Sequence, residues 1–160
     1  MNNIPTEQAS IIRRHQKISP VNVVEIAHDL KIKVFSANGD ENLSGKIIKT
    51  GPLHEGECSY SIFVNNKDKP TRQRFTIAHE IAHFLLHKND IGDGIVEDAL
   101  YRSGLSYKKE VEANKLAADI LMPWNLIYEA MNNDCVTISK LAKIFQVSES
   151  AMSIRLGVPS

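Results

Sequence analysis

The sequence predicts an α+β protein, with a small mixed sheet beside one apolar helix and a mainly helical second half. Three observations support this fold class. Three segments between residues 32 and 65 contain β-forming residues in partly alternating order, as short strands do. Residues 74–87 form a long, largely apolar segment. Residues 109–156 are rich in helix formers.

The first half should contain one helix, three strands and the apolar helix. Ser19 and Pro20 predict a helix start, with serine as the N-cap and proline at the first helical position. An apolar helical stripe follows as far as Leu30. Thr71 ends a polar connection and is predicted to cap the apolar helix. The strands are expected at residues 32–37, 44–50 and 59–65.

The second half should contain a loop and four helices. Residues 88–108 hold three glycines and are expected to form a long loop. Helices are expected at 109–122, ending at Pro123, and at 124–131. Residues 137–156 predict two short helices separated by a break near Gln146. The spacing of their apolar residues is typical of a helix-turn-helix. We expect residues 1–135 to form one domain and residues 136–160 a helical tail packed on it.

Composition excludes several classes of protein. Nineteen lysines and arginines balance nineteen aspartates and glutamates, so no overall basic field favours nucleic acid or membrane. No segment approaches the roughly 20 apolar residues of a membrane span, and the first 20 residues lack the apolar core of a signal peptide. Cys58 and Cys135 are isolated. We therefore expect free thiols and a cytoplasmic protein.

Residues 74–87, RFTIAHEIAHFLLH, place two histidines and a glutamate in an apolar helix. His79 and His83 are four apart, so their Cβ atoms should lie about 5–6 Å apart on one face. Both imidazoles can then reach one ion, and Glu80 can reach a water on it. This is the H-E-x-x-H pattern of zinc metallopeptidases. The alternative, histidines bonded to backbone carbonyls, leaves a buried Glu80 unexplained.

A catalytic zinc site needs a third protein ligand. His87 is about 12 Å along the helix axis from His79 at 1.5 Å per residue, too far for one ion. We expect His87 to support a ligand or to lie at the surface. Downstream, Glu110 and Asn114 share a helical face with two alanines. Glu112 lies about 200° around that helix from Glu110 and should face solvent or a neighbouring loop. Glu110 is therefore favoured as the third ligand, and Asn114 should hydrogen-bond a histidine ring.

The two stretches RQRFTIAHEIAHFLLH and EVEANKLAADILMP together resemble the ImmA/IrrE family of metallopeptidases. The resemblance extends from about residue 18 into the C-terminal tail. The presence of both stretches in one chain is far more specific than the H-E-x-x-H pattern alone. The resemblance implies a zincin-like domain of the gluzincin type, with His79, His83 and Glu110 as metal ligands and Glu80 as the catalytic glutamate. One ion per chain is expected, zinc or manganese.

The resemblance also implies a protein substrate. Members of the family cleave a cytoplasmic repressor that has a helix-turn-helix domain and is often encoded nearby. Cleavage relieves repression of a mobile element, a phage or a stress regulon. A regulator that binds the repressor without cutting it is an alternative.

Two further features bear on substrate binding. Residues 59–65 could be an edge strand that pairs with an extended substrate, or an interior strand. Tyr60, Arg102 and Tyr107 are candidate donors to the oxyanion, and nothing in the sequence selects among them.

A DNA-binding tail is the rival function. Its second helix, residues 148–156, offers only Arg155 as a base, whereas DNA affinity depends on several lysines and arginines. We therefore expect the tail to pack on the protease or to contact the repressor.

Overall fold

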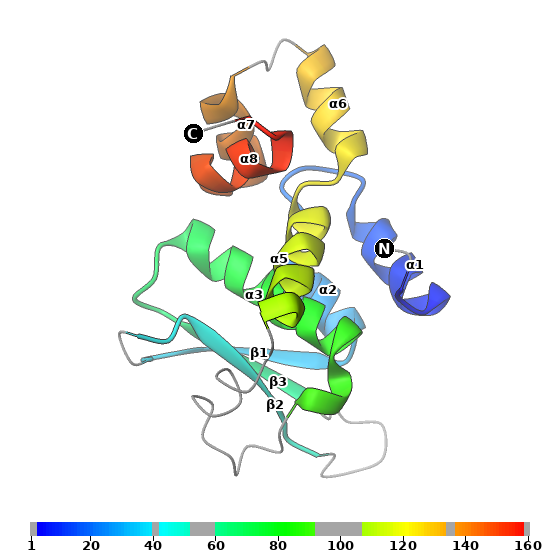
Figure 1. The fold of residues 1–160 in the computed structure, drawn as a ribbon, viewed down its shortest axis with the longest axis vertical. Helices are drawn as coiled ribbons and strands as arrows, with labels where there is room; N and C mark the ends of the chain where they lie inside the picture. Colours follow the sequence, from blue (N-terminus) through cyan, green and yellow to red (C-terminus); the bar gives the residue numbers. More distant parts are fainter. Residues whose placement is uncertain (1–2, 40–41, 52–59, 92–106, 134–136, 159–160) are drawn as a thin grey trace.

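The computed structural model describes residues 3–39, 42–51, 60–91, 107–133 and 137–158. Its elements, in chain order, are α1 (Thr6–His15), α2 (Val23–Asp29), β1 (Ile32–Ala37), β2 (Gly45–Lys49), β3 (Tyr60–Asn65), α3 (Pro70–Leu86), η1 (Lys88–Asp90), α5 (Tyr107–Leu121), α6 (Trp124–Asn132), α7 (Ile138–Phe145) and α8 (Glu149–Leu156). Figure 1 shows the sheet at one end of the molecule, α3 across it, α5 beside α3, and the pair α7–α8 at the other end.

The sheet is small and mixed, as the sequence predicts. β3 lies in the centre, parallel to β1 with Ile32 opposite Tyr60, and antiparallel to β2 with Ile47 opposite Ile62. The three isoleucines are buried in one core with residues of α3 and α5. All three predicted strands are confirmed, each within one residue at its ends.

The hypothesis that residues 59–65 form an edge strand is wrong, because β3 is hydrogen-bonded to a strand on each side. Among the described strands the edges are β1 and β2. β2 is the edge beside the motif helix: an added Cβ at Gly45 would lie 2.4 Å from Thr76 Cγ2 of α3. The alternating sequence of β3 fits a central strand and an edge strand equally well. The pattern alone therefore does not show where in the sheet the strand lies.

Two helix starts differ from the expected ones. α2 begins at Val23 because the side chain of Asn22 accepts the Glu25 N–H at 3.2 Å, and asparagine is as good an N-cap as serine. The Ser19–Pro20 peptide is cis and lies before this helix. α3 begins at Pro70, not after Thr71, because proline at the first helical position already has a helical φ.

The helix α1 is absent from the sequence-based expectation. It buries only Ala9 and Ile12, so its apolar stripe is too narrow to indicate a helix. Its anchor is Gln16, just beyond its end, whose side-chain amide donates to the carbonyls of Asp119 and Ile120 at 2.8 and 3.0 Å. α1 is thus tied to the end of α5 by long-range contacts that no local pattern shows.

The helices predicted at 109–122 and 124–131 are confirmed as α5 and α6, separated at Met122–Pro123. Ala113 and Ala117 of α5 are fully buried, and they lie in the same core as α3. Small side chains at the contact let the two helix backbones approach closely, which brings the first turn of α5 beside the histidines. Residues 92–106, most of the predicted loop, lie outside the described part of the chain.

The tail forms two short helices, as expected, with a break at Gln146–Ser148. Gln146 takes the left-handed conformation with φ +52°. Its N–H bonds the Lys143 carbonyl, and the Val147 N–H bonds the Ala142 carbonyl at 3.0 Å. This is the Schellman ending of a helix, for which glycine is the usual residue.

The tail packs on the rest of the molecule through two arginines. Arg74 of α3 donates to the carbonyl of Gln146 at 3.2 Å and to that of Val21 at 2.9 Å. Arg155 of α8 donates to Asp119 Oδ1 of α5 at 2.6 Å. Leu141 and Phe145, with Met152, belong to the same hydrophobic core as α3 and α5. None of the helices in the described ranges combines the length and the apolar character of a membrane span.

Candidate metal centre

The two histidines of the motif face each other on α3. His79 and His83 are one helical turn apart, and their Nε2 atoms are 3.0 Å apart. Both residues are buried, at 8% and 2% relative exposure. They lie within the stretch of α3, Thr76 to Leu85, that is buried throughout. The rings therefore point their Nε2 atoms at one shared place.

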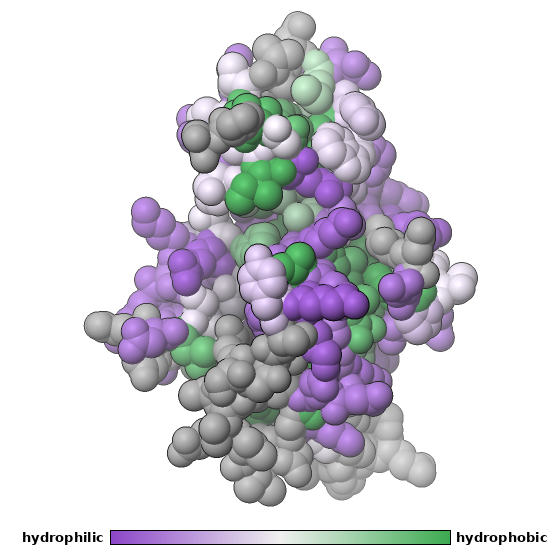
Figure 2. Space-filling view, viewed as in Figure 1, coloured by the Kyte–Doolittle hydropathy of each residue, from purple (hydrophilic) through white to green (hydrophobic). Residues whose placement is uncertain are grey.

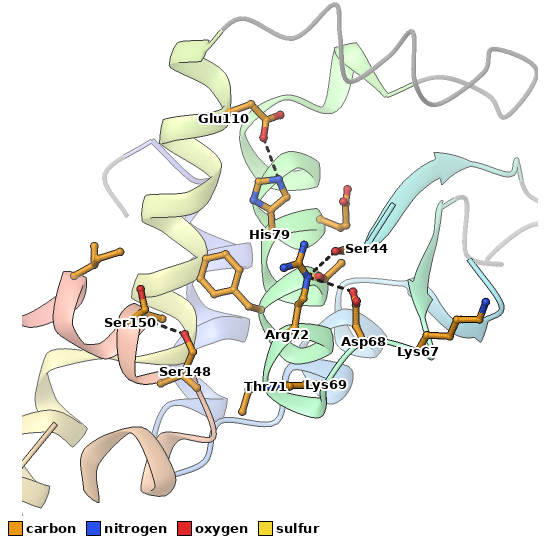
Figure 3. A pocket seen from close by; sticks show the side chains of 16 residues that line it. Ser44, Lys67, Asp68, Lys69, Thr71, Arg72, His79, Glu110, Ser148 and Ser150 are labelled. Carbon is orange, nitrogen blue, oxygen red and sulfur yellow. Dashed lines mark hydrogen bonds and ion pairs between the residues drawn. The ribbon is translucent and has the colours of Figure 1, made fainter. Parts of the chain in front are cut away.

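Glu110, in the first turn of α5, completes the cluster. Its Oε2 lies 3.4 Å from His79 Nε2, and its Oε1 lies 3.3 Å from His83 Nε2. The three donor atoms lie within 4.8 Å of one another. Figure 3 shows the carboxylate of Glu110 directed from α5 at the ring of His79. The close packing of α3 on α5 is what brings these side chains together.

The spacing of the donors suits a single small cation. In a tetrahedral site with bonds of about 2.0–2.1 Å, neighbouring donors lie about 3.3–3.4 Å apart. The separations here are 3.0, 3.3 and 3.4 Å. Two imidazole nitrogens and one carboxylate form a donor set that suits zinc and leaves a fourth position for water or substrate. The residues therefore fit the predicted ion.

Asn114, one turn after Glu110, contacts the ring of His79 at Nδ1, on the side away from Glu110. Its Oδ1 lies 2.9 Å from His79 Nδ1. A carbonyl oxygen can only accept, so Nδ1 carries the ring proton and donates it. The lone pair of a neutral His79 is then on Nε2, the atom that faces Glu110. This is the hydrogen bond to a histidine ring that the sequence suggested for Asn114.

Glu112 does not join the cluster. Its Oε2 lies 3.1 Å from Nε2 of His87, and His87 Nδ1 lies 3.1 Å from Nδ1 of His83. His87 is buried and is therefore not a surface residue. The i, i+4 spacing of His83 and His87 indicates their contact with each other. The contact of His87 with Glu112 joins two helices, so no local pattern shows it.

A cleft of about 830 Å³ opens at the cluster. Glu80, almost fully buried, lines it together with His79 and Glu110. On one side the wall is mixed and comes from the α7–α8 turn and α8, with Val147, Ser148, Ser150, Ala151 and Ile154. Glu80 is therefore placed where a substrate in this cleft would meet the metal ligands.

The opposite side of the cleft is polar. Arg72 Nε donates to Ser44 Oγ at 2.8 Å and lies 3.4 Å from Asp68 Oδ2, and Figure 3 shows these three side chains on the side away from α8. Figure 2 shows hydrophobic atoms over the helix pair and hydrophilic atoms over the first turns of α3. The cleft thus has one polar flank and one mixed flank, in which Ala151 and Ile154 of α8 are apolar.

The three candidate oxyanion donors differ in their position relative to the cleft. Tyr60 stacks edge-on against Phe84 with ring centroids 5.0 Å apart, and it is not among the residues that line the cleft. Burial raises the pKa of Tyr60 from its ordinary value. Tyr107 is exposed and lies one turn before Glu110. Arg102 lies outside the described residues. Of the three, only Tyr107 is therefore known to lie on an element that carries a cluster residue.

The chain is similar to known proteins of one class, a family of peptidases. Residues 27–157 match the peptidase M78 family, described as the IrrE N-terminal-like domain. The match covers most of the chain, including α3, α5 and the helix pair. The chain belongs to this family, which confirms the resemblance found in the sequence.

Two relatives carry the name radiation response metalloprotease IrrE. The chain is 38% identical to the protein of Deinococcus radiodurans over 93 residues, which are 56% of this chain and 28% of that protein. It is 36% identical to the protein of Deinococcus deserti over 107 residues, 64% of this chain and 38% of that protein. The chain thus matches well under half the length of each.

Among solved structures, a Mycobacterium tuberculosis transcriptional regulator matches 98% of this chain and 48% of its own chain. The TM-score is 0.59 and the sequence identity is 17%. At this identity the likeness shows a shared fold. Because it covers nearly the whole chain, that fold includes the helix pair as well as the sheet and α3.

Proposed function

We propose that this protein is a metal-dependent endopeptidase. The observation that carries the proposal is the convergence of His79, His83 and Glu110 at tetrahedral spacing, with Glu80 beside them in one cleft. Membership of a peptidase family supports the same activity. We assign His79, His83 and Glu110 as ligands of one zinc or manganese ion.

The chemistry follows from these positions. An ion bound there would polarise a scissile carbonyl and lower the pKa of water. Glu80 accepts the proton of the attacking water and delivers it to the departing amine. The burial of Glu80 limits competing solvent, so the proton passes between the carboxylate and the reacting groups. Asn114 holds His79 in the tautomer that presents Nε2.

An extended substrate could add to the sheet at β2. Ser44, the residue before this strand, lines the cleft, and the strand packs on α3 at Thr76, one turn before His79. A peptide lying along this edge would pass between the polar flank and α8. Backbone pairing would then supply affinity, and the flanks would select side chains.

We propose that the substrate is a cytoplasmic repressor with a helix-turn-helix domain, whose cleavage relieves repression. The family resemblance supports this choice. The isolated cysteines of the sequence support a reducing compartment. Direct DNA binding by the tail has less support, because Arg155 is bonded to Asp119 and lies over the ring of Trp124. The exposed bases of the two helices are Lys140 and Lys143, too few for strong phosphate neutralisation.

The test combines metal content with cleavage of a repressor encoded beside the gene, for the native protein and Glu80→Gln. We expect about one ion per chain in both, and cleavage by the native protein alone. Glutamine keeps the size of the side chain but cannot accept the proton. The loss should therefore appear in the rate of cleavage and not in the metal content.

Other outcomes separate the alternatives. Metal in both proteins with no cleavage by either, while the repressor still binds, would favour a regulator that binds without cutting. If the native protein held no metal after reconstitution, the proposal that it is a metal-dependent peptidase would be overturned. Retention of full cleavage by Glu80→Gln would remove Glu80 from the mechanism while leaving the metal site intact.

A further inference from the structure

Behind His83, on the side away from Glu110, a row of three polar side chains runs to the surface. His83 Nδ1 lies 3.1 Å from His87 Nδ1, and His87 Nε2 lies 3.1 Å from Glu112 Oε2. His83 and His87 are both buried, whereas the Glu112 side chain is 44% exposed. A hydrogen bond needs one donor and one acceptor, so the group at the end of this row determines where the protons of the row lie.

The direction of each hydrogen bond can be worked out from the carboxylate. An ionised Glu112 can only accept, so His87 Nε2 carries a proton and donates it. In a neutral His87 the other nitrogen, Nδ1, is then an acceptor. His83 Nδ1 must therefore carry the proton of its own ring and donate it to His87. The lone pair of His83 then lies on Nε2, towards Glu110 and His79.

We propose that Glu112 and His87 are positioning residues that fix the tautomer and ring orientation of His83 for metal binding. The proposal rests on the metal site proposed above. His87 then has the role towards His83 that Asn114 has towards His79, and each ligand is held at its Nδ1 atom. We call the row His83–His87–Glu112 the relay. Such outer partners typically change metal affinity about 10- to 100-fold when removed.

The relay also determines the character of the contact between the two ligand rings. With protons on both Nδ1 atoms, neither Nε2 has a proton to share across the 3.0 Å between them. Two lone pairs at that separation repel, and a cation placed between them and the Glu110 carboxylate removes the repulsion. The proton arrangement thus prepares the site for a cation instead of for a hydrogen bond between the rings.

A matched pair of variants tests the role of His87. His87→Asn keeps an acceptor oxygen near the place of Nδ1, and His87→Leu has nearly the same shape without an acceptor. We expect zinc affinity, measured by competition with a chromophoric chelator, to fall about 10- to 100-fold in the leucine variant and much less in the asparagine variant. Equal losses in both variants would indicate packing and would overturn the proposal.

A second pair tests the carboxylate at a more exposed position, where folding is not at risk. Glu112→Gln can still accept from His87, whereas Glu112→Met cannot. Both remove the same charge, so a difference between them reports the hydrogen bond alone. We expect weaker zinc binding in the methionine variant than in the glutamine variant. Identical affinities would remove Glu112 from the relay.

The decisive readout does not need metal or activity. Imidazole ¹⁵N–¹H correlation spectra of the metal-free native protein, at about pH 8.5 where ordinary imidazoles are neutral, should show the His83 proton on Nδ1. In His87→Leu it should move wholly or partly to Nε2. A native His83 proton on Nε2 would overturn the relay even if the protein binds metal. A proton on Nδ1 in a protein that fails to cleave would retain the relay while the proposed function fails.

Discussion

At the scale of single residues, the site depends on two acids that are two positions apart. Glu110 and Glu112 are alike in sequence, yet one faces His79 and His83 and the other faces His87. The helical rotation between them predicted that they would point in different directions. What the rotation left open was the partner of Glu112, because that partner is on another helix.

The two acids give a prediction that separates ligand from support. Glu110→Gln should weaken zinc binding by more than the about 10- to 100-fold loss typical of an outer partner, because a ligand and its charge are removed. Glu112→Gln, with the same chemical change on the same helix, should bind zinc almost as the native protein does. Chelator competition measures both, and the reverse order would make Glu112 the ligand.

Close approach at Gly45 gives a prediction on stability. A Cβ there would lie 2.4 Å from Thr76 Cγ2 and 2.7 Å from the Phe63 carbonyl oxygen. Gly45→Ala should therefore lower the free energy of unfolding by about 1–3 kcal/mol, as overpacking does. Urea denaturation checks this. Adding Thr76→Ser removes the nearer methyl group and should recover part of the loss; no recovery would place the strain at the carbonyl.

At the scale of elements, local patterns predicted most helices and strands but not their partners. The alternation of residues 59–65 indicated a strand, yet its central position depends on β1 and β2, which come from elsewhere in the chain. α1 was missed because its stabilising contacts are with the end of α5. The H-E-x-x-H spacing predicted the pairing of His79 with His83 because both lie on one helix.

The turn between α7 and α8 carries a local strain that can be removed. Gln146 has φ +52°, where a residue with a Cβ pays about 1–2 kcal/mol that glycine avoids. Glycine also loses more entropy on folding, so Gln146→Gly should raise the free energy of unfolding by about 0.5–1 kcal/mol. Gln146→Ala is the control and should show no gain. Thermal or urea unfolding of the three proteins would contradict this if alanine and glycine behaved alike.

At the scale of the whole molecule, the helix pair serves as a wall of the cleft. Arg74 joins the end of α7 to α3, and Arg155 joins α8 to α5, so both helices are held against the elements that carry the metal cluster. This arrangement leaves Ile154 78% exposed at the cleft, where an apolar side chain is in contact with water unless a substrate covers it. The apolar spacing of residues 137–156 predicted two helices, but it did not predict that one of them would line the same cleft as His79 and Glu80.

Ile154 therefore offers a test of the cleft as a substrate site. Covering an isoleucine side chain contributes about 1.5–3 kcal/mol, which is about 10- to 100-fold in affinity. If the substrate packs on α8, Ile154→Asp should lower kcat/KM for repressor cleavage by roughly that factor, mainly through KM, with metal content and unfolding temperature unchanged. Ile18→Asp is the matched control, because Ile18 is 75% exposed and is not among the residues that line the cleft. Equal effects of the two changes, or none at Ile154, would show that the substrate reaches Glu80 without touching the helix pair, along β2 alone.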